Sequence, residues 1–302
     1  MTHLAIVGIP RASGIPQASR RETSAMSKRD AYDAGVPCWV ETLQPDPRSA
    51  LGFYGSLLGW EFSAPGPMPG DLPGEYFVAD VDGCAVAGIS ALPGPGGSPI
   101  AIWNTMVRVD DADAAVDRAT CAGASLVLGP LDASGEGRGA VLIDPTGAAF
   151  SVWEARGRAG AQLVNEPGTW AMSSLHTPDP LAAAAFYGAL FGWESEPITP
   201  GSPVMLFRLP GYDGGAPVQP IPRDVVAVMT ATTEGPEGAA VPPNWTVNLR
   251  VDDADAVAAH AAVLGGTILM APMDALGMRT AVLLDPQGAA FSISQITALT
   301  AA

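Results

Sequence analysis

Glu41 and His176 are the two side chains that we single out as candidates for moving a proton inside a pocket. Each lies in a short apolar run a few residues before an Asp-Pro pair, which indicates a strand followed by a helix start. A carboxylate near Trp39 would have its pKa raised by desolvation, which suits a general acid or base. His176 also fits the plainer role of a hydrogen-bonded histidine beside a helix cap.

Alternation along the predicted strands places further residues on the same side as these two. The first set is Trp39, Glu41, Leu43, Asn104, Met106, Arg108, Ser151 and Trp153, and the second is Met172, Ser174, His176, Thr246, Asn248, Arg250, Ser292 and Ser294. Large apolar groups mixed with a few hydrogen-bonding groups are the usual lining of a small-molecule pocket. We therefore expect each set to face a cavity.

The first set suits a planar ligand. Trp39, Trp153 and Met106 could hold an aromatic ring between them, while Asn104 or Ser151 could bond to its oxygens. Two plainer readings stay open: tryptophan and methionine on an inner sheet face are also typical of a core, and Glu41 could pair with Arg108 at the cavity mouth.

The closing strand of each set follows the turn Asp-Pro-x-Gly, at residues 144–147 and 285–288. Proline presets φ in such a turn and glycine supplies a positive φ. The turn therefore fixes where the following strand starts, and strand alternation then aims Ser151 and Ser292 inward.

Two long internal repeats set the organisation of the chain. PDPLAAAAFYGALFGWE at residues 178–194 matches PDPRSALGFYGSLLGWE at 45–61, and NWTVNLRVDDADAV at 244–257 matches IWNTMVRVDDADAAV at 102–116. In the first half, strands are predicted at residues 38–43, 60–62, 75–80, 84–90, 103–109, 125–128 and 138–143, then the turn and closing strand within 144–154, with helices at 47–58 and 112–122. We predict an α+β fold of four βαβββ modules: a flexible leader (1–33), a first domain (34–155), a linker (156–168) and a second domain (169–302).

The composition of the chain excludes several classes of binding partner. The net charge is −16, with only 15 Lys and Arg, which argues against nucleic acid and anionic membranes. The three cysteines form no disulfide or zinc pattern, and no apolar run reaches the length of a membrane span. We expect a cytoplasmic protein, monomeric or homodimeric, whose acidic surface suits a cationic ligand.

The order of the four modules, with FYGxLxGWE in the first and third and DPxGAAFS closing the second and fourth, resembles the vicinal oxygen chelate superfamily. This superfamily includes glyoxalase I, bleomycin-resistance proteins and extradiol dioxygenases, and the resemblance extends over residues 37–297. It is strongest to tandem-domain actinobacterial members. It implies that each pair of modules curls into a half-barrel around a cavity. It also implies a divalent metal held by residues of the first and last strands of each module.

The ligand positions that this resemblance implies are Trp39, Asn104, Met172 and Thr246 on the first strands, and Ser151 and Ser292 on the last. None is a good ligand for a transition metal. The chain has only three histidines, His3, His176 and His260, so a two-histidine-one-carboxylate site cannot form there. We expect no metal and no other cofactor.

Three functions follow as hypotheses. The first is a metal-independent binding protein for a partly aromatic, polyketide-like natural product, as in bleomycin resistance; it would sequester an antibiotic or assist a biosynthetic enzyme such as an oxygenase. The ligand would contact the cavity-facing residues named above. The second is a metal-independent isomerase, lyase, cyclase or hydroxylase of secondary metabolism, with Glu41 or His176 as acid or base. The third is a metal-dependent glyoxalase or dioxygenase.

Overall fold

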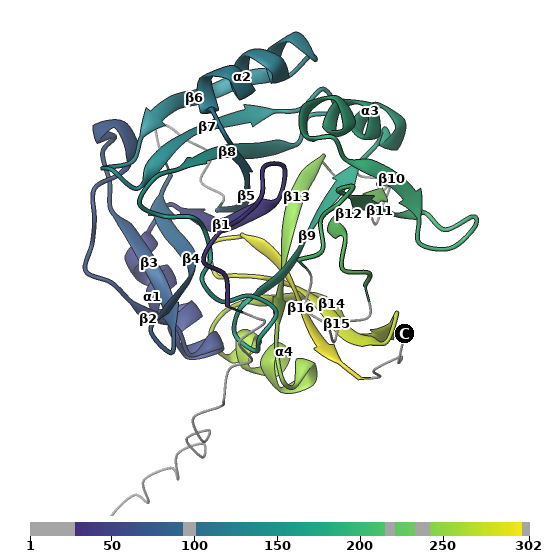
Figure 1. Cartoon of the computed structure of the whole chain (residues 1–302). Helices are drawn as coiled ribbons and strands as arrows, with labels where there is room; N and C mark the ends of the chain where they lie inside the picture. The colour runs from purple at the N-terminus through teal and green to yellow at the C-terminus, as the bar shows by residue number, and fades with distance from the viewer. Residues whose placement is uncertain (1–27, 93–100, 215–220, 233–241, 298–302) are drawn as a thin grey trace, which may run out of the picture.

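The computed structural model describes residues 28–92, 101–214, 221–232 and 242–297, which form two curved, mixed sheets of eight strands each (Figure 1). The first sheet and the helices connected to it are β1 (Pro37–Gln44), α1 (Pro47–Leu58), β2 (Glu61–Phe62), η1 (Pro69–Asp71), β3 (Tyr76–Val81), β4 (Cys84–Ala91), β5 (Ile102–Val109), α2 (Ala112–Cys121), β6 (Ser125–Asp132), β7 (Gly137–Ile143) and β8 (Ala149–Ala155). The second sheet and its helices are β9 (Trp170–Thr177), α3 (Pro180–Phe191), β10 (Glu194–Pro197), β11 (Val204–Arg208), β12 (Val225–Ala231), β13 (Asn244–Arg250), α4 (Ala254–Val263), β14 (Thr267–Ala275), β15 (Met278–Leu284) and β16 (Ala290–Ile296).

Each sheet joins two modules through their first strands. The strand orders are β2-β3-β4-β1-β5-β8-β7-β6 and β10-β11-β12-β9-β13-β16-β15-β14. β1 and β5 run antiparallel with Glu41 opposite Asn104, and each has the closing strand of its own module as a parallel neighbour. The predicted α+β class and the tandem half-barrel architecture are therefore confirmed.

Local sequence explains the helix ends. Asp46 caps α1, accepting a hydrogen bond from the backbone of Ser49, and Pro47 occupies the first helical turn. Gly59 ends the helix in the left-handed region at φ 73°, where a side chain would be strained. Asp179 and Gly192 do the same at the two ends of α3.

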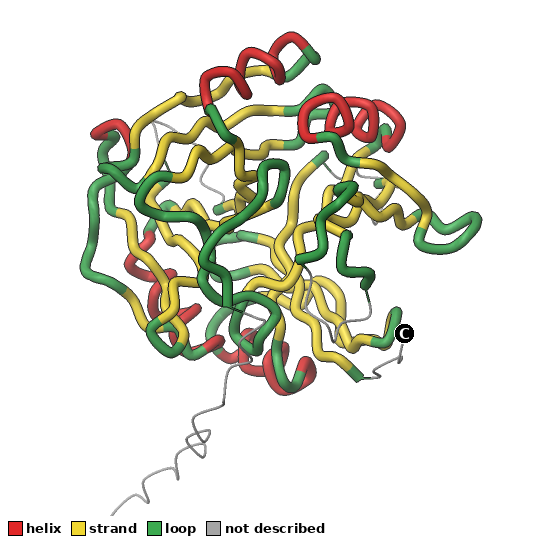
Figure 2. The backbone as a smooth tube through the Cα atoms, in the orientation of Figure 1, coloured by secondary structure: helices red, strands yellow, loops and turns green. Residues whose placement is uncertain are grey.

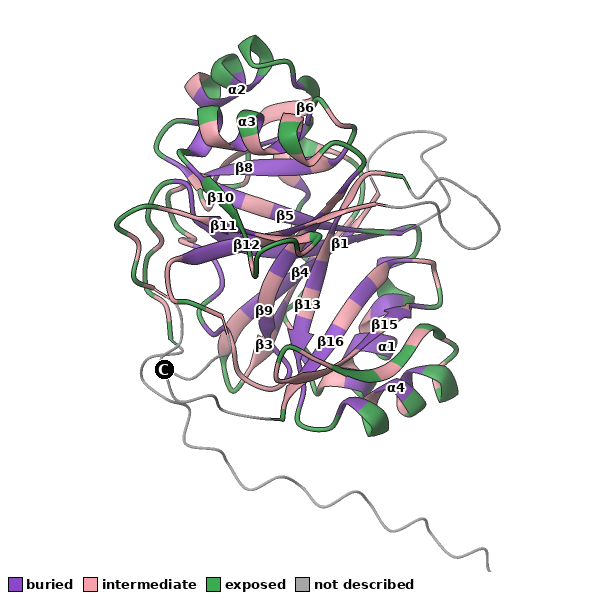
Figure 3. Ribbon diagram, turned by 90° about the vertical axis from the view of Figure 1, so that its right-hand side faces the viewer, coloured by how far each residue is buried: buried purple, intermediate pink, exposed green. Residues whose placement is uncertain are grey.

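The helices pack across the two domains. α1 lies against α4 and α2 lies against α3, so each helix pair joins one domain to the other (Figures 1 and 3). The Phe53 ring contacts Phe291 at 6.4 Å between centroids, and Phe150 contacts Phe186 at 5.8 Å. Both buried cores consequently contain residues of both sheets.

A buried tyrosine of each domain bonds to the Asp-Pro-x-Gly turn of the other. The Tyr54 hydroxyl donates to Asp285 Oδ2 at 2.9 Å, and the Tyr187 hydroxyl donates to Asp144 Oδ2 at 2.7 Å. Both rings are fully buried, as their place in the apolar helix stripe predicts. The turns thus orient the closing strands and also join the domains.

The sequence misassigns two segments. Residues 28–33 are assigned to the leader, yet the backbone of Arg29 bonds to Gln162 and the Tyr32 hydroxyl donates to Ala161 at 2.6 Å. These two linker residues provide hydrogen bonds that a free leader would lack. β6 also extends beyond the predicted residue 128 to Asp132, because it keeps pairing with β7 through a register shift.

The strands form the interior and the helices lie towards the outside, as Figure 2 shows. Residues 1–27 of the predicted leader lie outside the described residues. None of the described helices combines the length and continuous apolar character that crossing a bilayer requires.

Candidate functional site

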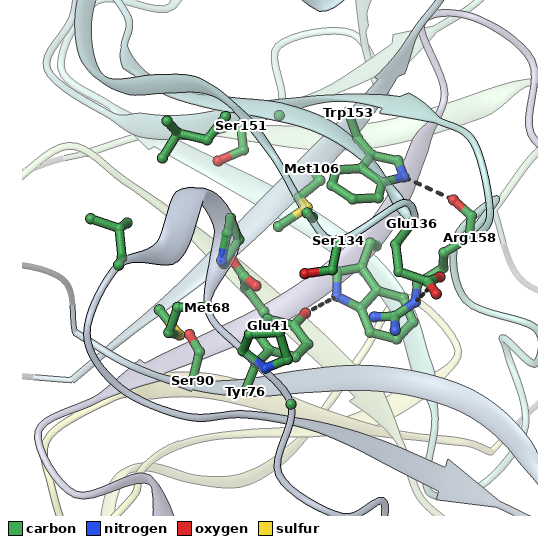
Figure 4. A pocket seen from close by; sticks show the side chains of 18 of the residues that line it. Glu41, Met68, Tyr76, Ser90, Met106, Ser134, Glu136, Ser151, Trp153 and Arg158 are labelled. Atoms are coloured by element: carbon green, nitrogen blue, oxygen red, sulfur yellow. Dashed lines mark hydrogen bonds and ion pairs between the residues drawn. The ribbon is translucent and has the colours of Figure 1, made fainter.

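The first half-barrel encloses a cavity of about 410 Å³. Its walls come from strands β1 and β3–β8, from the loop after β2 and from the linker (Figure 4). The lining residues are Trp39, Glu41, Leu43, Ser63, Ala64, Gly66, Pro67, Met68, Pro69, Leu72, Tyr76, Val78, Ser90, Met106, Leu128, Leu131, Ala133, Ser134, Glu136, Gly139, Ala140, Val141, Ser151, Val152, Trp153 and Arg158. The lining is mainly apolar, with a few polar groups among it, as in most small-molecule sites.

Two tryptophans and a methionine form the apolar walls. Trp39 and Met106 face each other across β1 and β5, and Trp153 lies on β8. The Trp153 ring lies over Gly137 and Gly139 of the neighbouring strand, where a Cβ on Gly137 would overlap the indole. These glycines allow the ring to lie flat against the sheet as a cavity wall.

A chain of hydrogen bonds crosses the cavity floor. Trp39 Nε1 donates to the Tyr76 hydroxyl at 2.8 Å, and that hydroxyl bonds in turn to Glu41. Asn104 Nδ2 donates to Glu41 Oε1 at 3.1 Å and to Ser151 Oγ at 2.8 Å. Glu41 therefore accepts hydrogen bonds from two donors, and this hydrogen-bond network holds its carboxyl group in one orientation.

Glu41 is 7% exposed, and burial raises the pKa of its carboxyl group above the ordinary value. The hydrogen bonds from Asn104 and Tyr76, and the charge of Arg158, act in the opposite direction. Burial also raises the pKa of Tyr76, with Glu41 adding to the effect. The cavity thus holds one carboxyl group that is easier to protonate than usual.

Arg158 lies at the edge of the cavity (Figure 4). Its guanidinium carbon is 5.1 Å from the centre of the Trp39 ring and 5.9 Å from that of Tyr76, within the range of cation–π attraction. Glu136 pairs with it at 3.6 Å. Its carbonyl oxygen accepts a 2.9 Å hydrogen bond from Trp153 Nε1, which fixes its backbone.

The loop between β2 and β3 covers another side of the cavity. Met68 is 4% exposed, and η1 follows directly. Gly70 has φ 61° and lies so close to Leu131 of β6 that a Cβ would come within 2.9 Å of that side chain. The loop therefore spans from the first module to the second, across the open side of the half-barrel.

The cavity brings together six predicted residues of the first domain: Trp39, Glu41, Leu43, Met106, Ser151 and Trp153. Asn104 lies behind them, bonded to Glu41 and Ser151.

Arg108 lies elsewhere: it pairs with the exposed Asp110 and does not reach Glu41. The predicted pair of Glu41 with Arg108 is wrong, because Arg108 sits near the end of β5 beside an exposed carboxylate.

Of the corresponding residues of the second domain, Arg250 and Ser294 are buried, whereas the other six are half-buried and several of them bond to one another. His176 Nε2 is 3.0 Å from Thr246 Oγ1, and Thr246 contacts the carbonyl of Ser174. Asn248 Nδ2 donates to Ser292 Oγ at 2.9 Å, and Met172 stands opposite Asn248 on β9. Burial lowers the pKa of His176, which favours its neutral form.

The donor groups do not fit a transition metal. In the first domain the resemblance implies metal ligands at Trp39, Asn104 and Ser151. Strand pairing gives a fourth such position, Gly88 on β4, where a Cβ would overlap the Tyr76 hydroxyl. The phenol thus fills the place from which a fourth ligand would extend. No group of three His, Cys, Asp or Glu suited to a metal occurs among the described residues.

Sequence reasoning missed Tyr76, the wall formed by β6, and Arg158. Alternation along residues 75–80 places Tyr76 and Val78 on one face, so extending the strand argument to β3 would have found the tyrosine. Leu128 and Leu131 lie on an edge strand whose register shifts, which hides the alternation. Arg158 lies in a linker, where no periodicity indicates direction.

Comparison with known proteins places the geometry in context. A family model described as a glyoxalase-like domain matches residues 39–153 and again 171–294. A Mycobacterium tuberculosis protein, CFP32, named as a candidate glyoxylase, is 39% identical over 89% of this chain and 97% of its own. The anthracycline biosynthesis protein DnrV of Streptomyces peucetius is 35% identical over 88% of this chain and 94% of its own.

Among solved structures, the Mn(II)-bound glyoxalase of Novosphingobium aromaticivorans has a TM-score of 0.58 at 16% identity. The match covers 88% of this chain and 83% of that one. At that identity the likeness concerns the fold, and the metal belongs to that protein.

Proposed function

The chain belongs to the family of glyoxalase-like domains, and we propose that its first domain binds a flat, partly aromatic small molecule without a metal ion. The observation that carries this proposal is the cavity itself, with Trp39, Met106 and Trp153 in its walls and Glu41 and Ser151 among its polar groups. Aromatic walls with a few oriented polar groups favour a planar ligand that bears oxygens.

The size of the cavity supports the same class of ligand. Its volume of about 410 Å³ lies within the range typical of sites that bury a drug-sized ligand. Because Glu41, Asn104 and Ser151 are already bonded to each other, their positions require little rearrangement on binding. A rigid ring system would lose little entropy in such a site.

The relatives indicate which ligands to test first. DnrV and the DauV protein of Streptomyces sp. are named for anthracycline biosynthesis, so a fused-ring polyketide is the natural first choice. Binding would serve to sequester such a compound, as an antibiotic-resistance protein does, or to present it to a biosynthetic enzyme such as an oxygenase.

Titration of a hydroxyanthraquinone such as alizarin, followed by quenching of tryptophan fluorescence, tests the proposal. We expect saturable quenching, because Trp39 and Trp153 line the cavity. Met106→Trp would fill the cavity and abolish binding, whereas Leu181→Trp, at a position that is 84% exposed on α3, adds the same side chain without effect. Equal binding by both variants would place the ligand elsewhere and contradict the proposal.

A second candidate is a metal-independent enzyme that uses Glu41 as acid or base, an isomerase, lyase, cyclase or hydroxylase. Burial and the raised pKa of the Glu41 carboxyl group at the cavity wall favour it. His176, the other sequence candidate, belongs to the second domain and bonds to Thr246. Glu41→Gln should abolish any turnover, even at saturating ligand; unchanged turnover would rule out this role.

A metal-dependent glyoxalase or dioxygenase reaction is the third candidate. Such a reaction needs a bound metal, but the implied ligand positions of the first domain hold Trp39, Gly88, Asn104 and Ser151, which do not form a suitable ligand set. A stoichiometric transition metal in purified protein, measured by elemental analysis, would overturn the metal-independent proposal.

A further inference from the structure

Arg158 occupies a cage that has the features of a cation-binding site. Two aromatic rings, Trp39 and Tyr76, face its guanidinium group at 5.1 Å and 5.9 Å. The Glu136 carboxylate pairs with it at 3.6 Å. Aromatic faces combined with carboxylates are the usual means of recognising an organic cation.

Acidic groups predominate around this cage. Besides Glu136, the charge of Arg158 lies near enough to Glu41 and Asp80 to lower the pKa of both, against the effect of burial. Arg158 is the only Lys or Arg among the described residues that line the cavity, and Glu41 and Glu136 both line it. Without Arg158 the region would carry an excess of negative charge.

The Arg158 side chain is held weakly although its backbone is fixed. The backbone N–H of Arg158 donates to Glu136 at 2.9 Å, and its carbonyl accepts from Trp153. Its side chain remains 24% exposed, and Glu136 is 46% exposed, so their ion pair is of the partly solvated kind that contributes little. Rotation of the side chain alone would therefore open the cage.

We propose that Arg158 is a displaceable plug in a cation site, and that the ligand of this cavity is an aromatic compound carrying a protonated amine that takes its place. The inference rests on the proposed binding function and specifies its ligand class. Arg158 acts as an internal competitor, present until a ligand cation arrives.

The charges decide which ligands can make this exchange. A ligand cation replaces the positive charge of Arg158 beside Glu41 and Glu136, so the net charge of the cavity does not change. A neutral ligand that displaces Arg158 leaves the buried Glu41 without its nearby cation, which is costly. An anionic ligand meets Glu41 and Glu136 directly.

The test uses three flat probes of similar size: 9-aminoacridine, which is protonated at neutral pH, acridine, which is neutral, and the anion anthracene-9-carboxylate. Their affinities for the full-length protein are measured by equilibrium dialysis, with Arg158→Gln as the test variant. Arg156→Gln is the matched control, because Arg156 pairs with Asp132 and Glu154 and does not line the cavity. Circular dichroism verifies that both variants are folded.

We expect the wild type to prefer 9-aminoacridine, and Arg158→Gln to strengthen its binding by about tenfold, because the competing cation is gone. Acridine should gain less, because it brings no charge to replace Arg158 beside Glu41 and Glu136, and Arg156→Gln should match the wild type. Glu41→Gln should reduce the preference for the cation.

Three results with Arg158→Gln would overturn the inference: weaker binding of the cation, equal gains for the cation and the neutral probe, or the loss of tight carboxylate binding that the wild type shows. The last would make Arg158 a residue that recognises anions. If alizarin and acridine bind and 9-aminoacridine binds no more tightly than acridine, this inference is wrong and the proposed function still stands. Failure of every aromatic probe to bind would remove both.

Discussion

At the scale of single residues, Glu41 links the stability of the first domain to its chemistry. Its carboxyl group is buried at the cavity wall, and Asn104 and Tyr76 hold it by hydrogen bonds. Where the superfamily resemblance implies a metal, this chain instead has a hydrogen-bonded network that ends at Ser151. The network preserves a rigid polar floor and holds a buried carboxyl group at the cavity wall.

We predict that Glu41→Gln changes how stability depends on pH. Burial raises the folded-state pKa above its ordinary value of 4.5, so the folded protein holds the proton more tightly than the unfolded chain. The stability that Glu41 contributes is therefore fully present below that ordinary value and is lost as the pH rises through the raised folded-state value. Glutamine keeps the acceptor oxygen but does not titrate.

The measurement is the difference in melting temperature between wild type and Glu41→Gln, from about pH 4 to about pH 8. We expect the difference to shift in favour of the variant as the pH increases. A difference that stays constant, or that shifts in favour of the wild type, would show that the carboxyl group is not desolvated in the folded protein.

At the scale of elements, the sequence was sufficient for most strands and helix ends. Asp-Pro starts and glycine ends act through local backbone geometry, so α1 and α3 could be placed from a few residues. Alternation gave the inward faces of β1, β5 and β8 for the same reason.

What sequence could not provide was contact between elements. Arg158 reaches Trp39 only because the linker folds back along β1, where the backbone of Ala161 bonds to Cys38 at 2.8 Å. The Asp-Pro-x-Gly turns were predicted as local features, yet Asp144 also accepts a hydrogen bond from Tyr187, 43 residues away. Neither partner leaves a periodic signal, since each pairing depends on how the two sheets meet.

These turn contacts predict unequal effects for two matched substitutions. Tyr187→Phe removes the donor to Asp144 Oδ2, and Tyr54→Phe removes one donor to Asp285 Oδ2. Asp285 Oδ2 also accepts a 2.7 Å hydrogen bond from Gln44, so it stays bonded. We expect each substitution to destabilise the protein by about 1–3 kcal/mol, with the greater loss for Tyr187→Phe.

Urea unfolding of the two variants provides the comparison. Both tyrosines are fully buried, and each accepts one tryptophan N–H, from Trp103 at 3.1 Å and Trp245 at 2.9 Å, so the loss of that acceptor is common to both. Equal losses, or a greater loss for Tyr54→Phe, would mean that Gln44 does not support Asp285 as the structure indicates.

At the scale of the whole molecule, the modules pair twice in different ways. Within a sheet the first module joins the second, and the third joins the fourth. Within the helical layers the first module packs on the fourth and the second on the third (Figure 3). Each buried core consequently draws on both sheets, and Trp60 of the first module donates to the carbonyl of Gly168 at the end of the linker, at 2.6 Å.

This arrangement predicts that the two domains unfold together. Separating them would expose Phe53 and Phe291 in one core and Phe150 and Phe186 in the other, which together form large apolar faces. We therefore expect a single calorimetric transition whose calorimetric and van't Hoff enthalpies agree, and Tyr187→Phe should lower its midpoint without splitting it. Two resolved transitions would show that each sheet is stable alone. In that case a fragment of residues 28–168 should retain alizarin binding, whereas a shared core requires the fragment to bind hydrophobic dyes and to lose the cavity.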